Sequence, residues 1–429
     1  MKHERFHYRS LDEVKTTATE CGAFLPLQED VSPLFQPLNL GNKTAANRIA
    51  LQPMEGSDGT EHGAPGEKTW RRYERFARGG AGLIWFEAVA TVSEGRASAH
   101  QLMLTPDNLD DFKRLVAHIK ETGLKENGYE PVIVMQATNS GRYSKPTGVP
   151  APMIAYHCPP LEDPALDDGC IVTDDQLKRF AAAYEPAAKL AREAGFDGVD
   201  VKCCHRYLAC ELLSAFTRPG IYGGDYENRT RFLKEAFAAA QSGIGDGFLT
   251  SRMNAYDGFE YPWGWGVREG GGLEVDLTEP LRLIGELRDQ FHIPLINITM
   301  GNPYKNPHVN RPYDNGNYVP PEHPFDGLGR VMKGLSDIQH AYPDLPVLGS
   351  AFSYLRQHAP LLAAGMVGEG HCAMAGFGRL AFANPDFPNQ LREKGKIDKM
   401  CLTCGGCAVL LRAGRDAGCI VHDREVYQL

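Results

Sequence analysis

The sequence alternates eight times between a short apolar run and a longer amphipathic stretch, and this alternation limits the possible folds more than any other feature. The apolar runs have the length of buried strands, and the stretches between them have helical periodicity. Eight units of this kind predict a (β/α)8 TIM barrel of the α/β class. The expected strands are residues 49–53, 81–86, 131–136, 198–202, 247–252, 293–298, 345–349 and 372–376.

The expected helices follow these strands. A doubly wound open sheet would give a similar alternation and is the alternative architecture. No glycine-rich dinucleotide fingerprint follows any expected strand, which weakens this alternative.

The expected helical stretches lie near residues 67–78, 106–122, 173–194, 226–242, 277–290, 327–341, 353–363 and 384–393. The charge run from Arg71 to Arg78, within the first of them, is interpreted as a solvated helix face.

We divide the chain into a leading arm (1–45), a barrel (46–398) and a cysteine-rich tail (399–429). Pro26, Pro33 and Pro37 predict that the arm is irregular, because proline interrupts helices. Two connections, 137–172 and 253–276, are long enough to indicate functional loops.

Charge and hydropathy exclude some classes of partner. The net charge of -9 disfavours nucleic acid as a ligand. No apolar stretch reaches the twenty residues that a membrane-spanning helix needs. The first residues are polar and charged and lack the apolar core of a signal peptide, so we expect a cytoplasmic protein.

Polar and reactive side chains gather where the expected strands end. The active sites of TIM barrels are built at the C-terminal ends of the strands, so these residues are the candidates for binding and catalysis. The candidates delivered in this way are Pro53, Met54, Glu55, Glu87, Ala88, Gln136, Lys202, His205, Tyr207, Arg252, Gly349, Ser350, Gly376, Gly378 and Arg379.

Three features of this set indicate a flavin mononucleotide (FMN). Glycines with an arginine after the last two strands are suited to a phosphate, because backbone N–H groups and a guanidinium both bind anions. Gln136 offers an amide that can bind the edge of a ring carrying both donors and acceptors. Arg252 would place a cation where reduction builds negative charge on the ring.

Several long motifs then identify a family. The sequence resembles the old yellow enzyme family of FMN-dependent oxidoreductases from about Leu34 to the C-terminus. The closest resemblance is to the branch with cysteine-rich tails that includes 2,4-dienoyl-CoA reductase and trimethylamine dehydrogenase. The motifs are ANRIALQPM, RRYERFARGGAGLIWFEA, MQATNSGRYSKP, YGGDYENRTRF, SRMNAYDG and GFGRLAFANPDF.

The resemblance implies an enzyme that takes hydride from NADH or NADPH and passes it through FMN to an activated C=C bond of an α,β-unsaturated carbonyl compound or acid. Gln136 matches the contact to the flavin pyrimidine, and Arg252 matches the contact to flavin N1. Gly378 with Arg379 matches the phosphate contact, and Gly349-Ser350 lies where the second phosphate loop is expected.

The family also implies the catalytic residues. Tyr207 matches the tyrosine that protonates the substrate carbon, and His205 matches the second residue of the pair that holds the substrate carbonyl. Two positions depart from the family. Lys202 replaces the first histidine of that pair, and Glu55 replaces a threonine or cysteine near flavin O4. A histidine of the related branch assists protonation, which makes His308 a second candidate acid.

Two other functions stay open: an amine dehydrogenase or N-demethylase, and an electron-transfer subunit of a larger complex. The related branch continues beyond its cysteines into flavodoxin-like and FAD domains, whereas this sequence stops at Leu429, ten residues after Cys419. We therefore expect the electrons to come from NAD(P)H directly or from an electron-donor protein. The expected partners are a small unsaturated substrate and further copies of the chain in a homo-oligomer.

Four cysteines of the tail form one cluster with the spacing C-x2-C-x2-C-x11-C. Four thiolates suit either a [4Fe–4S] cluster or structural zinc. The related branch uses its tail for [4Fe–4S], which we favour over zinc. The expected ligands are Cys401, Cys404, Cys407 and Cys419.

Overall fold

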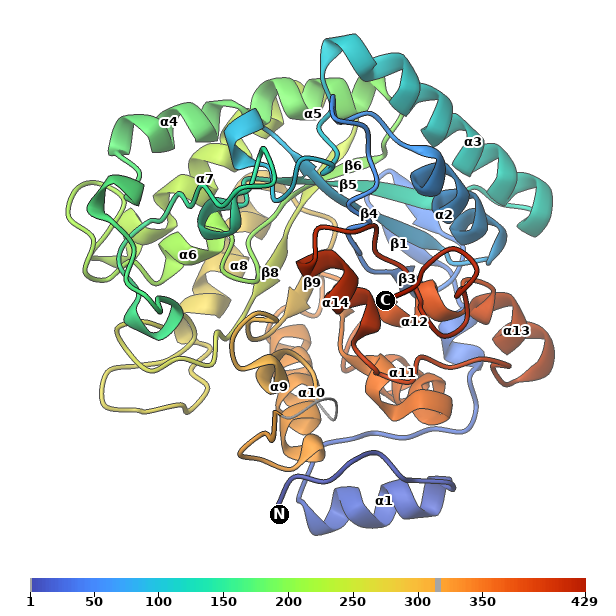
Figure 1. Cartoon of the computed structure of the whole chain (residues 1–429). Coiled ribbons are helices and arrows are strands. Elements are labelled where there is room, and N and C mark those ends of the chain that lie inside the picture. The colour runs from blue at the N-terminus through green and yellow to red at the C-terminus, as the bar shows by residue number, and fades with distance from the viewer. Residues whose placement is uncertain (1, 313–317) are drawn as a thin grey trace.

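The computed structural model describes residues 2–312 and 318–429, and its centre is a parallel barrel (Figure 1). The strands follow the order β7-β6-β5-β4-β3-β11-β10-β9-β8, and every neighbouring pair is parallel. They are β3 (Ile49–Leu51), β4 (Leu83–Ala90), β5 (Val132–Thr138), β6 (Gly198–Val201), β7 (Phe248–Thr250), β8 (Arg252–Asn254), β9 (Ile296–Thr299), β10 (Val347–Gly349) and β11 (Met374–Phe377).

The segments β7 and β8 are two halves of one strand, separated at Ser251. The first half pairs with β6 and the second with β9, which closes the barrel at eight strands. At the break, side chains form some of the hydrogen bonds that backbone groups form elsewhere between the strands. Asp200 Oδ1 accepts from the backbone N–H of Arg252 at 2.7 Å, and Ser251 Oγ donates to the carbonyl of Val201 at 2.7 Å. The prediction of a TIM barrel is confirmed, with each expected strand in place.

Helices surround the barrel, as Figure 1 shows, and cover all eight stretches predicted as helical. In the described part of the chain, no helix is long and apolar enough to cross a membrane. The helices after the arm are α2 (Glu67–Arg78), α3 (Leu109–Asn127), α4 (Asp174–Ala182), α5 (Tyr184–Glu193), α6 (Leu208–Leu213), α7 (Tyr226–Gly243), α8 (Thr278–Phe291), α9 (Pro307–Asn310), α10 (Pro324–Ala341), α11 (Ala359–Gly368), α12 (Arg379–Ala383), α13 (Phe387–Lys394) and α14 (Gly406–Arg412).

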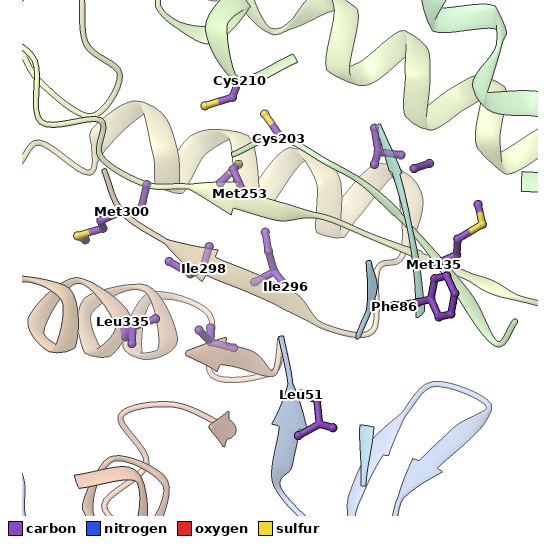
Figure 2. Packing of buried hydrophobic residues seen from close by; sticks show 14 of the residues in the cluster. Leu51, Phe86, Met135, Cys203, Cys210, Met253, Ile296, Ile298, Met300 and Leu335 are labelled. Atoms are coloured by element: carbon purple, nitrogen blue, oxygen red, sulfur yellow. The ribbon is translucent and has the colours of Figure 1, made fainter. Parts of the chain in front are cut away.

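Alternating side chains along the strands build two separate cores. The larger core lies between the outer face of the barrel and the helices. Figure 2 shows part of it, with Leu51, Phe86, Met135 and Ile298 on strands and Leu335 on α10. All five are at most 1% exposed. The helices are therefore held to the barrel by this apolar layer.

The smaller core fills the N-terminal half of the barrel interior. Ala50, Trp85 and Leu348 belong to it, together with two residues of the hairpin formed by β1 (Leu38–Leu40) and β2 (Lys43–Ala45). These hairpin residues, Leu40 and Ala45, are fully buried. The hairpin seals this end of the barrel, so a cavity can form only toward the opposite, C-terminal ends of the strands.

The leading arm is more regular than the prolines predicted. Helix α1 (Leu11–Glu20) begins with a capping box, in which Ser10 Oγ accepts from the N–H of Glu13 at 3.2 Å. All three arm prolines lie beyond this helix. The prediction of an irregular arm is therefore wrong for this segment, although the S-x-x-E signal was present in the sequence.

Candidate active site

A cavity of about 370 Å³ lies at the C-terminal ends of the barrel strands. It brings together most of the residues that the sequence predicted for a site. Gly349 is not in its wall, although the adjacent Ser350 is. The predicted residues that line it are Pro53, Met54, Glu55, Ala88, Gln136, Lys202, His205, Tyr207, Arg252, Ser350, Gly376, Gly378 and Arg379.

The amide of Gln136 is oriented by a buried carboxylate on the next strand. Asp200 Oδ2 accepts from Gln136 Nε2 at 2.7 Å and from Trp85 Nε1 at 2.8 Å. A carboxylate that accepts these bonds fixes the NH₂ end of the amide toward itself. The carbonyl oxygen of Gln136 is thereby left for a ring N–H in the cavity. Sequence reasoning missed Asp200, because a single acid inside an apolar strand gives no sign of its partner.

Arg252 is a buried cation at the inner end of the cavity. Burial lowers the pKa of this guanidinium, and its Nε has no hydrogen-bond partner among the described residues. A buried charge without a partner is costly, so this position is built to receive an anionic or electron-rich group. The side chain lines the cavity together with Gln136.

Close packing explains why glycine occupies position 376 in β11 and position 378 just after this strand. A Cβ at Gly376 would lie 2.2 Å from Gln52 Nε2, and a Cβ at Gly378 would lie 2.9 Å from the sulfur of Met54. Both glycines line the cavity, together with Ser350 and Arg379. Together with Gln136 and Arg252, this side of the cavity fits a flat heterocycle that carries a phosphate.

In the same cavity, Lys202 lies over the ring of Tyr207. Its Nζ is 3.4 Å from the ring centroid, close enough for a cation–π interaction. Burial lowers the pKa of Lys202 and raises the pKa of Tyr207 well above its usual value. Burial, assisted by the charges of Arg252 and Lys202, keeps the pKa of His205 well below its usual range. The site therefore offers a neutral imidazole, a neutral phenol and a cation.

The turn that carries these groups has an unusual backbone. His205 and Arg206 have φ angles of 60° and 62°, in the left-handed region that non-glycine residues rarely adopt. The fully buried Arg206 holds the turn in place, since its guanidinium bonds Asp257 Oδ2 and the hydroxyl of Tyr156, each at 2.9 Å. The two long loops thus meet at Arg206 and orient the turn that ends at Tyr207.

Glu55 is the one carboxylate among the described residues of the cavity wall. Its Oε1 is buried without a hydrogen-bond partner in the described part of the structure. Burial raises the pKa of Glu55 to about 7, and the positive charge of Lys202 opposes this rise. Glu55 therefore changes its charge near neutral pH.

We expect Glu55→Gln to remove a pH-dependent loss of stability. A carboxyl group whose pKa is higher in the folded state keeps its proton there longer, so stability falls as pH rises from about 4.5 to about 7. The variant should match the wild type near pH 4.5 and become more stable above pH 7, by at most about 3 kcal/mol. Urea unfolding across this pH range measures the difference.

The exposed Glu61 supplies the control for this experiment, because Glu61→Gln should leave the pH profile unchanged. If wild type and Glu55→Gln differ by the same amount at every pH, the carboxyl group of Glu55 does not titrate in this range.

The cavity wall is strongly cationic, although the whole chain carries a net charge of -9. Beside the single carboxylate, six cationic side chains line the cavity in the described part of the chain. Such a concentration of one charge attracts ligands of the opposite sign. The six are Lys145, Lys202, Arg252, Arg311, Arg379 and Arg412.

The C-terminal tail forms part of the wall. Figure 1 shows α14 in the middle of the ring of helices, and its residues Cys407, Ala408, Leu411 and Arg412 line the cavity. Ion pairs fix the tail to α2. Asp423 bonds Arg71 and Arg75, each at 2.7 Å, and Asp416 bonds Lys68 at 2.6 Å. The tail therefore forms part of the cavity wall, and the sequence did not indicate this position.

The tail cysteines gather in one region. Burial raises the pKa of the Cys407 and Cys419 thiols, and the nearby thiols of Cys401 and Cys404 raise it further. Among the described residues, no three His, Cys, Asp or Glu side chains are arranged to hold a metal ion. The arrangement seen does not form a coordination site, so the [4Fe–4S] cluster and zinc stay predictions.

His308 lies apart from the other candidates. Its Nδ1 bonds the hydroxyl of Tyr318 at 2.6 Å, and its side chain does not line the described cavity. The lining residues that sequence reasoning missed include Tyr143, Tyr304 and Arg311. They lie in the connections that follow β5 and β9, beyond the strand ends themselves.

A closed parallel barrel with a cationic, amide-lined cavity at its C-terminal end defines the class of flavin-binding TIM barrels. Residues 33–267 match the model of the NADH:flavin oxidoreductase / NADH oxidase family, and the chain belongs to this family. The resemblance to old yellow enzyme, an FMN-dependent oxidoreductase of this family, is thereby confirmed.

Curated relatives agree with this assignment. The chain is 32% identical over 234 residues to an NADPH dehydrogenase of Geobacillus thermodenitrificans and 32% identical over 235 residues to one of Bacillus subtilis. In each case the match covers 52% of this chain and 64% of the relative.

Solved structures share the fold. A 2-naphthoyl-CoA reductase superposes with a TM-score of 0.75 at 21% identity, over 92% of this chain and 57% of the other. An old yellow enzyme homologue from Zymomonas mobilis superposes with a TM-score of 0.63 at 24% identity, over 85% and 94%. Histamine dehydrogenase from Rhizobium sp. 4-9 gives 0.68 at 19% identity, over 91% and 52%.

Proposed function

We propose that this protein is an FMN-dependent oxidoreductase that reduces an activated C=C bond with NAD(P)H, and that its acceptor is an anionic α,β-unsaturated compound. Bound FMN would accept hydride from the nicotinamide and deliver it to the acceptor. Lys202, His205 and Tyr207 line the same cavity as the groups suited to FMN, and this observation carries the proposal.

Different side chains would bind the ring and the phosphate of FMN. Gln136, held by Asp200, would accept from the flavin pyrimidine edge, and Arg252 would lie beside the part of the ring where negative charge develops. Arg379, with the backbone around Gly376, Gly378 and Ser350, would hold the phosphate. These roles follow the family pattern.

On the substrate side, Lys202 binds the acceptor. A lysine is a compact cation with three donors, whereas the histidine usual in the family is a neutral planar donor. Among the described residues Lys202 forms no ion pair, and its pKa is lowered by burial. An incoming carboxylate would pair with its charge and satisfy its donors. The neutral His205 completes the contact to the carbonyl group, and Tyr207 supplies the proton.

A matched pair of acceptors tests the substrate class. We expect the reduced protein to be reoxidised by cinnamate about 10- to 100-fold faster than by methyl cinnamate at equal, low concentration, since a charge-assisted hydrogen bond contributes about 1.5–3 kcal/mol. Lys202→Met should abolish this preference and leave the rate with the ester nearly unchanged. Stopped-flow absorbance of the flavin measures both rates.

Lys178→Met, on the exposed face of α4, is the control and should keep the preference for the acid. If the ester and the acid react equally well in the wild type, the acceptor is not recognised as an anion, although the ene-reductase activity itself would stand.

Lys202 disfavours the alternative of an amine dehydrogenase or N-demethylase, because its positive charge would repel a protonated amine. An electron-donor protein and a homo-oligomer are proposed partners. Iron and zinc analysis of anaerobically purified protein decides between [4Fe–4S] and zinc for the tail cysteines.

A further inference from the structure

Tyr304, in the loop between β9 and α9, presents its phenol to the phenol of Tyr207. The two oxygens are 3.1 Å apart, and either one can be the donor. The side chains differ in their access to water, because Tyr207 is 3% exposed and Tyr304 is 39% exposed. The Tyr304 side chain therefore connects the buried hydroxyl group of Tyr207 to a more exposed part of the cavity wall.

Neighbouring residues hold Tyr304 in this position. Its ring packs on the ring of Tyr143 with centroids 4.2 Å apart, and its backbone N–H donates to Asn302 Oδ1 at 2.8 Å. The amide of Asn302 also donates to the hydroxyl of Tyr143 at 3.0 Å. The loop is thus built to direct the phenol of Tyr304 into the cavity.

A buried proton donor needs a route by which it regains its proton. Burial raises the pKa of Tyr207 well above its usual value, and the nearby Tyr304, Glu55 and Cys204 raise it further. The cation that faces its ring is Lys202. A phenolate at this position is therefore short-lived wherever a proton can reach it. Burial also raises the pKa of Tyr304, to about 12, so Tyr304 carries a proton at neutral pH.

We propose that Tyr304 returns a proton to Tyr207 after each turnover, which makes the two tyrosines a proton relay from solvent to the substrate. This inference rests on the proposed function, which supplies the hydride from NAD(P)H. In the first step the O–H bond of Tyr207 breaks and its proton forms a C–H bond on the carbon next to the one that received the hydride. The O–H bond of Tyr304 then breaks, its proton restores Tyr207, and Tyr304 takes a proton from solvent.

Tyr304→Phe tests the relay, because it removes the hydroxyl group and keeps the ring that packs on Tyr143. The flavin of the variant should be reduced by NAD(P)H at the wild-type rate. With cinnamate and excess NAD(P)H we expect a burst of one product per site, because Tyr207 starts protonated. The later turnovers should be about tenfold slower and should accelerate with the concentration of a buffer acid, which the wild type should not show.

Tyr261→Phe, which alters an exposed tyrosine outside the cavity, is the control and should show neither a burst nor buffer dependence. The relay is wrong if Tyr304→Phe has the wild-type ratio of first to later turnovers, and the proposed function would then stand. A first turnover slowed as strongly as in Tyr207→Phe would also overturn it, since Tyr304 would act before Tyr207. If no enoate reoxidises the wild type, the proposed function fails and the relay fails with it.

Discussion

Replacing Tyr207 with phenylalanine is expected to slow the reoxidation of the reduced protein by an enoate by about 10²–10⁴-fold, the usual contribution of a general acid. The phenol is neutral at working pH because burial raises its pKa, so it can donate a proton. The substitution removes one oxygen and keeps the ring under Lys202. Flavin reduction by NAD(P)H needs no proton from this residue and should keep its rate.

Stopped-flow measurement of the two half-reactions separates these effects. Tyr261→Phe, which alters an exposed tyrosine outside the cavity, should leave both rates as in the wild type. Unchanged reoxidation in Tyr207→Phe would show that another group donates the proton, and Tyr304 and His308 would be the next candidates.

Replacing Arg252 with methionine should have opposite effects on cofactor binding and on the stability of the flavin-free protein. FMN affinity should fall about 10- to 100-fold, because a charge-assisted contact is lost. The flavin-free variant should be as stable as the wild type or more stable, by up to about 4 kcal/mol, since an unpaired buried cation is replaced by an apolar side chain. Fluorescence titration with FMN and urea unfolding measure the two quantities.

Arg252→Lys keeps the charge and should lose less affinity than Arg252→Met. If Arg252→Met destabilises the flavin-free protein and binds FMN as the wild type does, the guanidinium has a structural role and does not contact the cofactor.

The sequence predicted the barrel because its signal is local and repeated. Each strand is an apolar run and each helix has its own periodicity, so eight units could be recognised without knowledge of their contacts. The helix α1 was missed for the opposite reason: three prolines outweighed the capping box of Ser10 and Glu13, although none of them falls within the helix.

Local sequence patterns could not predict the ion pairs between residues that are far apart in the chain. The run from Arg71 to Arg78 was interpreted as a solvated helix face, but Arg72 is buried between Asp58 and Glu87, and Arg71 bonds Asp423 in the tail. Asp423 lies 352 residues further along the chain, and helical charge spacing contains no information about such a partner.

The residues of the candidate site also include some that local patterns could place and others that they could not. Residues at strand ends, such as Lys202 and Arg252, could be placed because barrel topology brings strand ends together. Tyr304 and Arg412 reach the cavity from a loop and from the tail, and their positions depend on how these segments pack on the barrel. Asp200 escaped notice because its function is to orient Gln136, which only the hydrogen bond reveals.

The central claim is that the cavity holds a flavin that carries hydride from a nicotinamide to an anionic enoate. Anaerobic titration of the purified protein tests it most directly. The account predicts bound FMN that one equivalent of NADH or NADPH bleaches and one equivalent of cinnamate restores, with dihydrocinnamate formed in equal amount. A protein that binds no FMN, or whose oxidised flavin is bleached by methylated amines while no enoate reoxidises the reduced flavin, would contradict it.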